Sequence, residues 1–277
     1  MIISIELMGG LGNQLFQIFN TIAYSLRYNK KFIFQYFETL KKYGIERPTY
    51  WNSFLKNLKK FTTNYNIQLP IYREKHYTFL NIPFIERDFK FFGYFQSYKY
   101  FEDQYEEICN LINIKKFKND IFTEHTKYFD NNITISLHFR LGDYKHQQHN
   151  HPVMPIEYYI NSIQYIINKT DNNNFNILYF CEKDDNEIVN NSIKKLNNIF
   201  SNVKFIKVDD NIDDWKQMLL MSLCNHNIIA NSSFSWWGAY FNSNAEKIVC
   251  YPNIWFGPSI KNDTKDLCPN NWNKIVI

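Results

Sequence analysis

The second half of the chain alternates short apolar runs with segments of helical periodicity. The apolar runs have the length of buried strands and lie at residues 133–138, 175–181, 203–208, 227–230 and 248–251. Between them, apolar side chains recur every three or four residues; one such segment begins at Pro155, and Asp184 or Asp185 is expected to cap another. Strands separated by single helices pair in parallel through right-handed crossovers. The pattern therefore predicts an α/β domain built on a parallel sheet.

The first part of the chain begins with the same alternation and then loses it. An apolar run at residues 2–7 leads into a glycine-rich turn and then an amphipathic helix over residues 13–28. Two more strands are predicted at residues 31–36 and 89–95, followed by a helix from residue 96 to 115. The proline- and aromatic-rich residues 36–88 fit no regular pattern.

A polar stretch at residues 117–130 separates these two patterns and is predicted to be a linker. We therefore expect two Rossmann-like α/β domains, at residues 1–125 and 126–277, that face a cleft. Ligands of such domains bind outside the carboxyl ends of the strands.

Composition and charge exclude several classes of protein. The net charge of +4 comes from scattered Lys and Arg, which argues against a nucleic-acid partner and allows a weak attraction to anionic ligands or membrane surfaces. The five cysteines lie far apart without a CxxC pair, so reduced thiols and a cytoplasmic enzyme are expected. No apolar run reaches the roughly 18 residues that a membrane span needs. Peripheral association with a membrane stays open.

His138, Arg140 and Asp143 lie where the strand at residues 133–138 ends. His138 and Arg140 point to the same side by the two-residue period of a strand. A guanidinium group matches the oxygens of a phosphate, so Arg140 is a candidate phosphate clamp and His138 a candidate contact to a base or ribose. Asp143 either orients Arg140 or acts as a general base. The alternatives are an arginine paired with a core acid and a histidine packed in the core.

Two turns between a strand and a helix have the character of anion sites. Residues 231–238 (NSSFSWWG) offer hydroxyl and N–H groups at a helix start, which suit a diphosphate; the alternative is an ordinary serine cap beside core tryptophans. Residues 8–13 (MGGLGN) either face a ligand or form a tight turn that needs positive φ. The spacing is not GxGxxG and no P-loop lysine follows, which argues against a dinucleotide or P-loop site.

Histidines crowd the loop that follows Tyr144. His146, His149 and His151 lie there, but no carboxylate or cysteine completes a metal-binding set. The chain also lacks an Asp-x-Asp pair, a common carboxylate clamp for a metal-bound nucleotide sugar. We therefore expect no metal, and an exposed loop whose His146 contacts an acceptor.

Four stretches resemble the α-1,2-fucosyltransferase family, glycosyltransferase family 11. They are GGLGNQLFQ at residues 9–17, GYFQSYKYF at 93–101, HFRLGDY at 138–144 and MSLCNHNIIANSSFSWWGAYFN at 221–242. They follow the order of the family and span nearly the whole chain, apart from residues 36–88. The chain departs from the family at Gln217, where the family carries an acid; Asp213 and Asp214 lie one turn earlier.

The resemblance implies a GT-B fold and an inverting, metal-independent transfer of L-fucose from GDP-fucose to the 2-hydroxyl of a galactose-type acceptor. It implies that Arg140 contacts the β-phosphate and His138 the nucleoside. The other donor contacts it implies are Ser233, Phe234 and Ser235 in the second domain and Gly10, Gly12 and Asn13 in the first. Asp143, Glu6 and His146 are candidates for the base, and Trp236 is a candidate platform for the acceptor sugar.

Three functions stay open at this point. The first is the fucosyl transfer just described, with GDP-fucose as co-substrate and a glycan, lipid-linked or free, as acceptor. The second keeps the donor and changes the acceptor to another sugar of a surface polysaccharide. The third is a lectin-like module that binds glycans through its many aromatic residues without turnover. GDP binding separates the enzymes from the lectin, and the sequence does not predict an oligomeric state.

Overall fold

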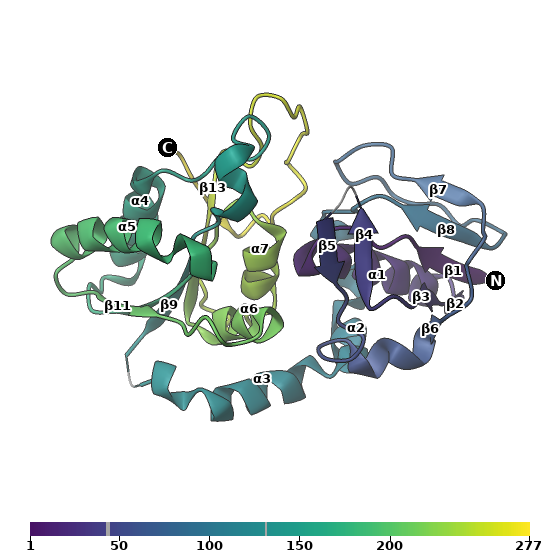
Figure 1. Ribbon diagram of the computed structural model, residues 1–277, viewed down its shortest axis with the longest axis horizontal. Helices are drawn as coiled ribbons and strands as arrows, with labels where there is room; N and C mark the ends of the chain where they lie inside the picture. Colours follow the sequence, from purple (N-terminus) through teal and green to yellow (C-terminus); the bar gives the residue numbers. More distant parts are fainter. Residues whose placement is uncertain (43–44, 131) are drawn as a thin grey trace. The chain divides into compact units, whose positions relative to one another are not determined.

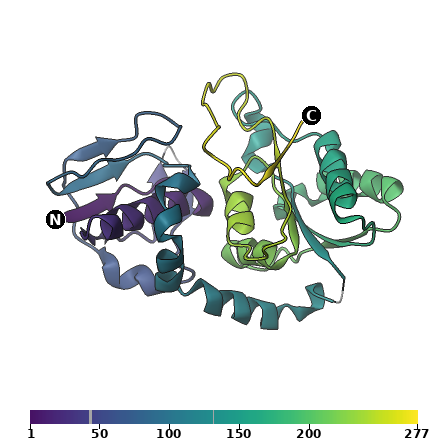
Figure 2. The same cartoon turned by 180° about the vertical axis from the view of Figure 1, so that it is seen from behind.

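The chain divides into two α/β units, each built around a parallel sheet (Figures 1 and 2). The computed structural model describes residues 1–42, 45–130 and 132–277. The first unit comprises Met1–Lys116 and Asn262–Pro269, and the second comprises Phe117–Lys261 and Asn270–Ile277. The division predicted between residues 125 and 126 therefore lies too late, and the return of a C-terminal segment to the first unit was missed.

The boundary falls inside a helix, so the predicted linker is wrong as well. Residues 117–130 contain most of α3 (Ile114–Glu124) and the short turn η4 (Thr126–Tyr128). The polar surface of this stretch misled the prediction, because α3 buries only the stripe formed by Ile114, Phe117 and Ile121. Apolar residues at that spacing are enough to dock a helix on one face.

The second unit holds a six-stranded sheet with the order β11-β10-β9-β12-β13-β14, and all its pairings are parallel. Its strands are β9 (Thr134–His138), β10 (Asn176–Phe180), β11 (Lys204–Lys207), β12 (His226–Ile228), β13 (Val249–Pro252) and β14 (Asn273–Ile275). Its crossover helices are α4 (Ile156–Thr170), α5 (Asn186–Ile199), α6 (Asp214–Leu223) and α7 (Ser233–Tyr240). The predicted alternation is confirmed, with β14 as the strand that the sequence did not reveal.

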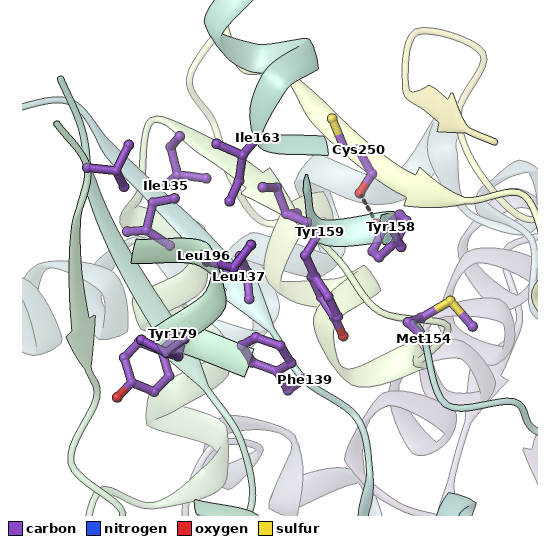
Figure 3. Close-up of a cluster of buried hydrophobic side chains, with 14 of the residues drawn as sticks. Ile135, Leu137, Phe139, Met154, Tyr158, Tyr159, Ile163, Tyr179, Leu196 and Cys250 are labelled. Carbon is purple, nitrogen blue, oxygen red and sulfur yellow. Dashed lines mark hydrogen bonds between the residues drawn. The ribbon is translucent and has the colours of Figure 1, made fainter. Parts of the chain in front are cut away.

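One face of this sheet packs on α4 and α5, as Figure 3 shows in close-up. Ile135, Leu137 and Tyr179 point from β9 and β10 into this core, and Ile163 and Leu196 meet them from the two helices. The Tyr158 hydroxyl group donates to the carbonyl oxygens of Ile229 and Cys250, so α4 is tied to the ends of β12 and β13. The buried aromatic hydroxyl thus satisfies its hydrogen bonds while its ring fills the core.

The opposite face of the same sheet is held to α6 and α7 by buried amides. The Asn227 side chain, at 0% exposure, donates to the Ser136 hydroxyl at 2.7 Å and to the Met221 carbonyl at 2.8 Å. It also accepts a hydrogen bond from Asn242, just beyond α7, at 2.8 Å. Gly238 lets α7 approach α6 closely, because a Cβ there would lie 2.8 Å from the Cβ of Met221. These contacts fix the position of the first turn of α7.

The first unit holds a four-stranded parallel sheet with the order β2-β1-β8-β7. Its strands are β1 (Ile2–Ile5), β2 (Lys31–Phe32), β7 (Ile71–Arg73) and β8 (Phe89–Phe92); the predicted strand at 31–36 is interrupted, and β3 (Phe34–Gln35) pairs with β6 (Thr62–Thr63) instead. A further pair, β4 (Thr39–Lys42) and β5 (Ile45–Pro48), is antiparallel. The buried helix α1 (Leu11–Arg27) covers β1.

The helix predicted at residues 96–115 is broken into shorter pieces. The structure has η2 (Tyr98–Tyr100), η3 (Glu102–Gln104), α2 (Tyr105–Ile112) and then α3, while η1 (Lys56–Phe61) lies earlier in the chain. Asn113, between α2 and α3, has φ +68°, a left-handed conformation that ends a helix. Across the described ranges, no helix combines the length and the apolarity that a membrane crossing requires.

The segment 262–269 belongs to the first unit through one buried aspartate. Asp266 receives a hydrogen bond from the Lys99 ammonium at 2.5 Å and another from the Phe79 backbone N–H at 3.1 Å. Its carbonyl oxygen accepts from the Ser97 hydroxyl at 2.6 Å. Lys99 and Ser97 lie in the stretch 93–101, so part of that motif serves to anchor this segment.

Candidate functional site

The strand order of the second unit contains a topological switch point. Numbered along the chain, its strands follow the order 3-2-1-4-5-6 of the doubly wound fold, so the direction of winding reverses between β9 and β12. Ligands of this fold bind outside the carboxyl ends of those two strands. The segments that leave these ends are residues 139–146 and residues 229–235. They hold most of the residues that the sequence singled out in this unit.

Arg140 lies just beyond β9 and is surrounded by acids. One terminal nitrogen of its guanidinium group donates to the Asp143 carboxylate, and the other donates to the Glu182 carboxylate at the end of β10. The Tyr144 ring covers the group, with its centroid 4.9 Å from the Arg140 Cζ atom. Asp143 thus takes the orienting role that was one of its two expected roles. Glu182 was missed, because it is distant in sequence and no local pattern joins it to Arg140.

The buried carboxylate of Asp185 holds the loop that follows Arg140. Asp185, at 0% exposure, accepts from the Gly142 backbone N–H at 2.8 Å and from the Lys145 ammonium at 2.6 Å. The ion pair raises the pKa of Lys145. Asp185 occupies the expected N-cap position of α5 but makes no capping bond from its side chain. Its carboxylate instead orders η5 (Gly142–His146), which holds Asp143 next to Arg140.

His138 is the last residue of β9 and is buried against α7. Its ring centroid lies 5.5 Å from that of Phe234, so side chains from the two sides of the switch point meet. Burial and the nearby Arg140 charge lower the pKa of His138 to about 3, which keeps the imidazole neutral at physiological pH. Among the described residues its Nδ1 atom has no hydrogen-bond partner. A neutral imidazole here can bond a ligand without adding charge.

The pH dependence of the free energy of unfolding tests whether His138 is buried and neutral. Its pKa in the folded state lies below the unfolded value of about 6.5, so its contribution to stability is present above that pH and is lost as pH falls toward 3. The wild type is expected to lose about 2 kcal/mol through this residue between pH 7.5 and pH 5. Urea unfolding at both pH values should show a smaller loss for His138→Gln. Equal losses in the two proteins would contradict a buried neutral imidazole.

Helix α7 begins inside the serine-rich motif. The Ser232 hydroxyl caps the helix by accepting from the Phe234 N–H at 3.3 Å, and the buried Ser235 hydroxyl donates to the Ser232 carbonyl at 3.4 Å. Ser233 is the first residue of the helix and is partly exposed. The alternative of a serine cap is therefore correct for Ser232. Ser233 and the first N–H groups of α7 still lie at the switch point, where a helix start favours an anion.

Two expected acceptor contacts have different outcomes. Trp236 is fully buried and stacks on Tyr240 at 4.6 Å between ring centroids, with Trp272 at 5.4 Å, so its role as a sugar platform is wrong. A fully buried ring that packs against neighbouring aromatic side chains offers no surface to a sugar. His146 lies exposed on η5, and its contact with an acceptor stays a prediction. Its neighbour His151 stacks on Tyr144 at 4.8 Å and thereby supports the Arg140 loop.

The departure from the family at Gln217 has a local explanation. Gln217 lies in the first turn of α6, where its side chain donates to the Ile212 carbonyl at 2.8 Å. Asp213 is the N-cap residue of this helix, and the Asp214 carboxylate accepts from the Trp215 N–H at 2.7 Å. These residues stabilise the start of α6.

The first unit has its own switch point between β1 and β8, and the glycine-rich turn leaves β1 there. Gly9 has φ +76°, which is why a glycine is required at that position. Gly10 is the N-cap residue of α1 in extended conformation, and a Cβ added to it would meet nothing within 4 Å. Gly12 is buried in the first turn of the helix. The positive φ of Gly9 confirms the tight turn, and contact of this turn with a ligand stays a prediction.

Asn13 is oriented by a residue that the sequence did not single out. Gln96 follows β8, is only 8% exposed, and donates from its side-chain nitrogen to the Asn13 Oδ1 atom at 2.7 Å. The Gln96 oxygen accepts from the Tyr77 hydroxyl at 2.5 Å. With its oxygen held, Asn13 directs its Nδ2 atom over the turn, 2.4 Å from where a Cβ of Gly9 would lie. The motif at residues 93–101 was quoted for the resemblance alone, and this bond gives it a role.

The backbone before Gln96 is strained and is held by a carboxylate. Phe95 has φ +53°, a left-handed conformation that is costly for an aromatic residue. Glu74 accepts hydrogen bonds from the N–H groups of Tyr94 at 2.7 Å and Phe95 at 3.0 Å. Burial raises the pKa of Glu74 to about 7. Gly93 leaves room for this side chain, because a Cβ there would lie 2.4 Å from the Glu74 Cβ.

Replacing Gln96 tests whether the orientation of Asn13 matters. In Gln96→Glu a carboxylate oxygen faces Asn13, so the Asn13 amide must turn its Nδ2 atom toward residue 96 and away from the turn. We expect about a tenfold loss of kcat/KM, the scale of one lost buried hydrogen bond. Tyr77→Phe is the matched control, since it removes only the far bond of Gln96 and should change kcat/KM less than threefold. An unchanged kcat/KM in Gln96→Glu would show that activity does not depend on the orientation of Asn13.

Within the described residues, no group of three or more His, Cys, Asp or Glu side chains is arranged to hold a metal ion. In the second unit, the described groups that offer positive charge at the switch point include the Arg140 guanidinium and the first N–H groups of α7, which suit an anion with several oxygens. In the first unit, the N–H groups around Gly10 lie at the start of α1.

The sequence and the fold of this chain are both similar to those of known glycosyltransferases. Along its length the chain is 28% identical over 302 aligned positions to an α-1,2-colitosyltransferase of Escherichia coli, covering 99% of both chains. It is 31% identical over 210 positions to the O-antigen biosynthesis glycosyltransferase WbnK of Escherichia coli, a match that spans 72% of this chain and 65% of that protein. Among solved structures it resembles the Escherichia coli ADP-heptose LPS heptosyltransferase II, with a TM-score of 0.51, 11% identity, and coverage of 99% of this chain and 89% of that one.

The fold is of the GT-B type, as the sequence predicted, with two Rossmann-like units. The sequence profile of Glycosyl transferase family 11 matches residues 2–276. The family that the four motifs indicated is thereby confirmed. This chain belongs to glycosyltransferase family 11.

Proposed function

We propose that the protein transfers L-fucose from GDP-fucose to the 2-hydroxyl group of a galactose-type sugar, with inversion and without a metal ion. The observation that carries the proposal is the position of Arg140 and the start of α7 on the two sides of one switch point. A nucleoside diphosphate needs charge neutralisation at that edge of the sheet, and these groups supply it. The full-length similarity to an α-1,2-transferase supports the linkage.

In this transfer the protein positions the two substrates and stabilises the charge of the leaving group. The acceptor hydroxyl oxygen forms a bond to the anomeric carbon while the bond to the diphosphate oxygen breaks, and GDP leaves with the electron pair. The negative charge that grows on the β-phosphate is stabilised by Arg140, by Ser233 and by the N–H groups of α7. Neutral His138 and the Phe234 ring contact the nucleoside side of the donor. Asp143 keeps Arg140 in place, and the proton of the acceptor hydroxyl passes to a carboxylate or to solvent.

Gly10, Gly12 and Asn13 of the first unit are proposed as further contacts to a phosphate group. The two glycines allow the backbone to approach it, and Asn13 offers its side-chain N–H groups. The acceptor is proposed to be a galactose-containing glycan of a surface polysaccharide, free or lipid-linked, because a similar protein carries the name of an O-antigen glycosyltransferase. His146, exposed on η5, is proposed to contact this acceptor.

A second candidate donor sugar is colitose. It is favoured by the colitosyltransferase that matches this chain from end to end. Nothing in the geometry of Arg140 or α7 distinguishes the two sugars, because both groups address the diphosphate.

Transfer assays separate these proposals. The protein is incubated with GDP-fucose or GDP-colitose, a chelator, and a set of galactosides, and the products are examined by NMR. An α-1,2-fucosylated galactoside formed in the presence of chelator is the expected product. A product only from GDP-colitose would move the donor assignment to colitose. Hydrolysis or transfer only after metal addition would contradict the metal-free site.

A further inference from the structure

Glu182 shares Arg140 with Asp143, but the two acids are built into the fold differently. Asp143 lies three residues after Arg140, within η5, and its place is fixed by the turn itself. Glu182 reaches Arg140 from the segment after β10, and 54% of its side chain is exposed, against 41% for Asp143. Because more than half of the Glu182 side chain is exposed, water can replace Arg140 as its partner, and the pair can open at low cost.

The absence of a side chain at Gly142 leaves room for the contact between Glu182 and Arg140. Gly142 has φ +40°, and a Cβ at that position would lie 2.8 Å and 2.9 Å from the two carboxylate oxygens of Glu182. A glycine at residue 142 therefore lets Glu182 reach across the loop to Arg140. The segment itself is held independently, because buried Asp185 binds the Gly142 N–H and the Lys145 ammonium. Glu182 can thus leave Arg140 without any movement of the backbone that carries it.

The charges at this point do not allow a diphosphate and both carboxylates to share one guanidinium group. Arg140 with Asp143 and Glu182 already has a formal charge of minus one. A diphosphate adds further negative charge within a few ångströms, where like charges repel strongly. Phosphate oxygens can bind the two terminal nitrogens of the guanidinium group through two charge-assisted hydrogen bonds. The Glu182 carboxylate, once displaced, can be solvated by water instead. The more exposed carboxylate, that of Glu182, is the one that must move.

We propose that Glu182 is a displaceable counter-anion: it occupies Arg140 until the donor diphosphate takes its place, and it reoccupies Arg140 as GDP departs. This inference rests on the proposed function, since it assigns the diphosphate to Arg140. Glu182 lowers the affinity for donor and product alike, because both must compete with it. It also assists release of GDP, whose tight retention would slow turnover.

The test compares GDP binding to the full chain and to Glu182→Gln by calorimetry at low and moderate salt. Removing the competing charge should tighten GDP binding about tenfold, the scale of one exposed charge pair together with relief of repulsion. Glu187→Gln is the matched control: Glu187 is exposed in the first turn of α5, and its replacement changes the net charge equally. It should alter the GDP Kd less than twofold.

The outcomes separate the inference from the function on which it rests. Tighter GDP binding in Glu182→Gln, with a lower kcat at saturating donor, supports a counter-anion that assists release. Unchanged or weaker GDP binding in that variant, beside normal binding in the wild type, overturns the inference and leaves the donor site intact. Absence of GDP binding in the wild type overturns both. Equal tightening in Glu187→Gln would reduce the effect to net charge and also overturn the inference.

Discussion

Arg140→Ala is expected to lower kcat/KM by about 10²-fold or more, the largest single loss in this protein. The guanidinium group is proposed to bind the leaving diphosphate, and removing an electrostatic donor of this kind costs about two to three orders of magnitude in rate. The fold should survive, because the Asp143 and Glu182 carboxylates that pair with Arg140 are exposed and can be solvated by water in its absence. Steady-state kinetics with the donor varied, together with a thermal melt, measure both effects.

Arg140→Lys is the control that separates charge from geometry. A lysine keeps the positive charge but loses the planar fork that holds two oxygens at once. It should recover part of the lost rate and remain well below the wild type. Turnover close to the wild type in Arg140→Ala would remove Arg140 from the mechanism, and full recovery in Arg140→Lys would show that charge alone suffices.

Gly9→Ala is expected to have the second-largest effect, through the first unit. Gly9 has φ +76°, where a side chain costs about 1–2 kcal/mol, and an added Cβ would lie 3.0 Å from the Asn13 Cβ and 2.4 Å from its Nδ2 atom. The start of α1 must shift and Asn13 must lose its orientation. We expect a loss of about 2 kcal/mol in stability and at least a tenfold loss in kcat/KM. Urea unfolding and kinetics measure the two losses.

Gly10→Ala, one residue further, is the matched control. A Cβ there meets no atom within 4 Å, so stability should remain within about 0.5 kcal/mol of the wild type. Its activity should still fall, because the added methyl group enters the space proposed for the diphosphate. A stable and fully active Gly10→Ala would show that no ligand approaches this turn. A fully stable Gly9→Ala would contradict the conformation of the turn.

Periodicity and motif spacing predicted most of the framework of the second unit. Buried strands and amphipathic helices leave local patterns in the sequence. The predicted apolar runs therefore agree with the bounds of β9 to β13 within one or two residues. The ends of these strands then placed Arg140, His138 and Ser233 at one edge of the sheet, because the carboxyl ends of parallel strands meet there. The contact between His138 and Phe234 agrees with this placement, and the role of these residues in a donor site stays a prediction.

The residues that support the site could not be found in this way. Glu182 contacts Arg140 and Gln96 contacts Asn13 across long stretches of sequence, and a lone Glu or Gln has no spacing to mark it. Trp236 was misassigned, because a buried tryptophan and a sugar platform look alike in sequence; only the stacking on Tyr240 distinguishes them. The domain boundary was displaced for a similar reason, since a helix with a narrow apolar stripe resembles a polar linker.

The central claim is that the second unit binds the diphosphate of a GDP-sugar through Arg140 without a metal ion. Calorimetric titration of the wild type and Arg140→Ala with GDP and with UDP, each in the presence of a chelator, tests it most directly. We expect the wild type to bind GDP in the presence of chelator and to bind UDP far more weakly, and Arg140→Ala to lose most of its GDP affinity. Binding of UDP in preference to GDP, binding only after a divalent metal is added, or equal GDP affinity in the two proteins would contradict it.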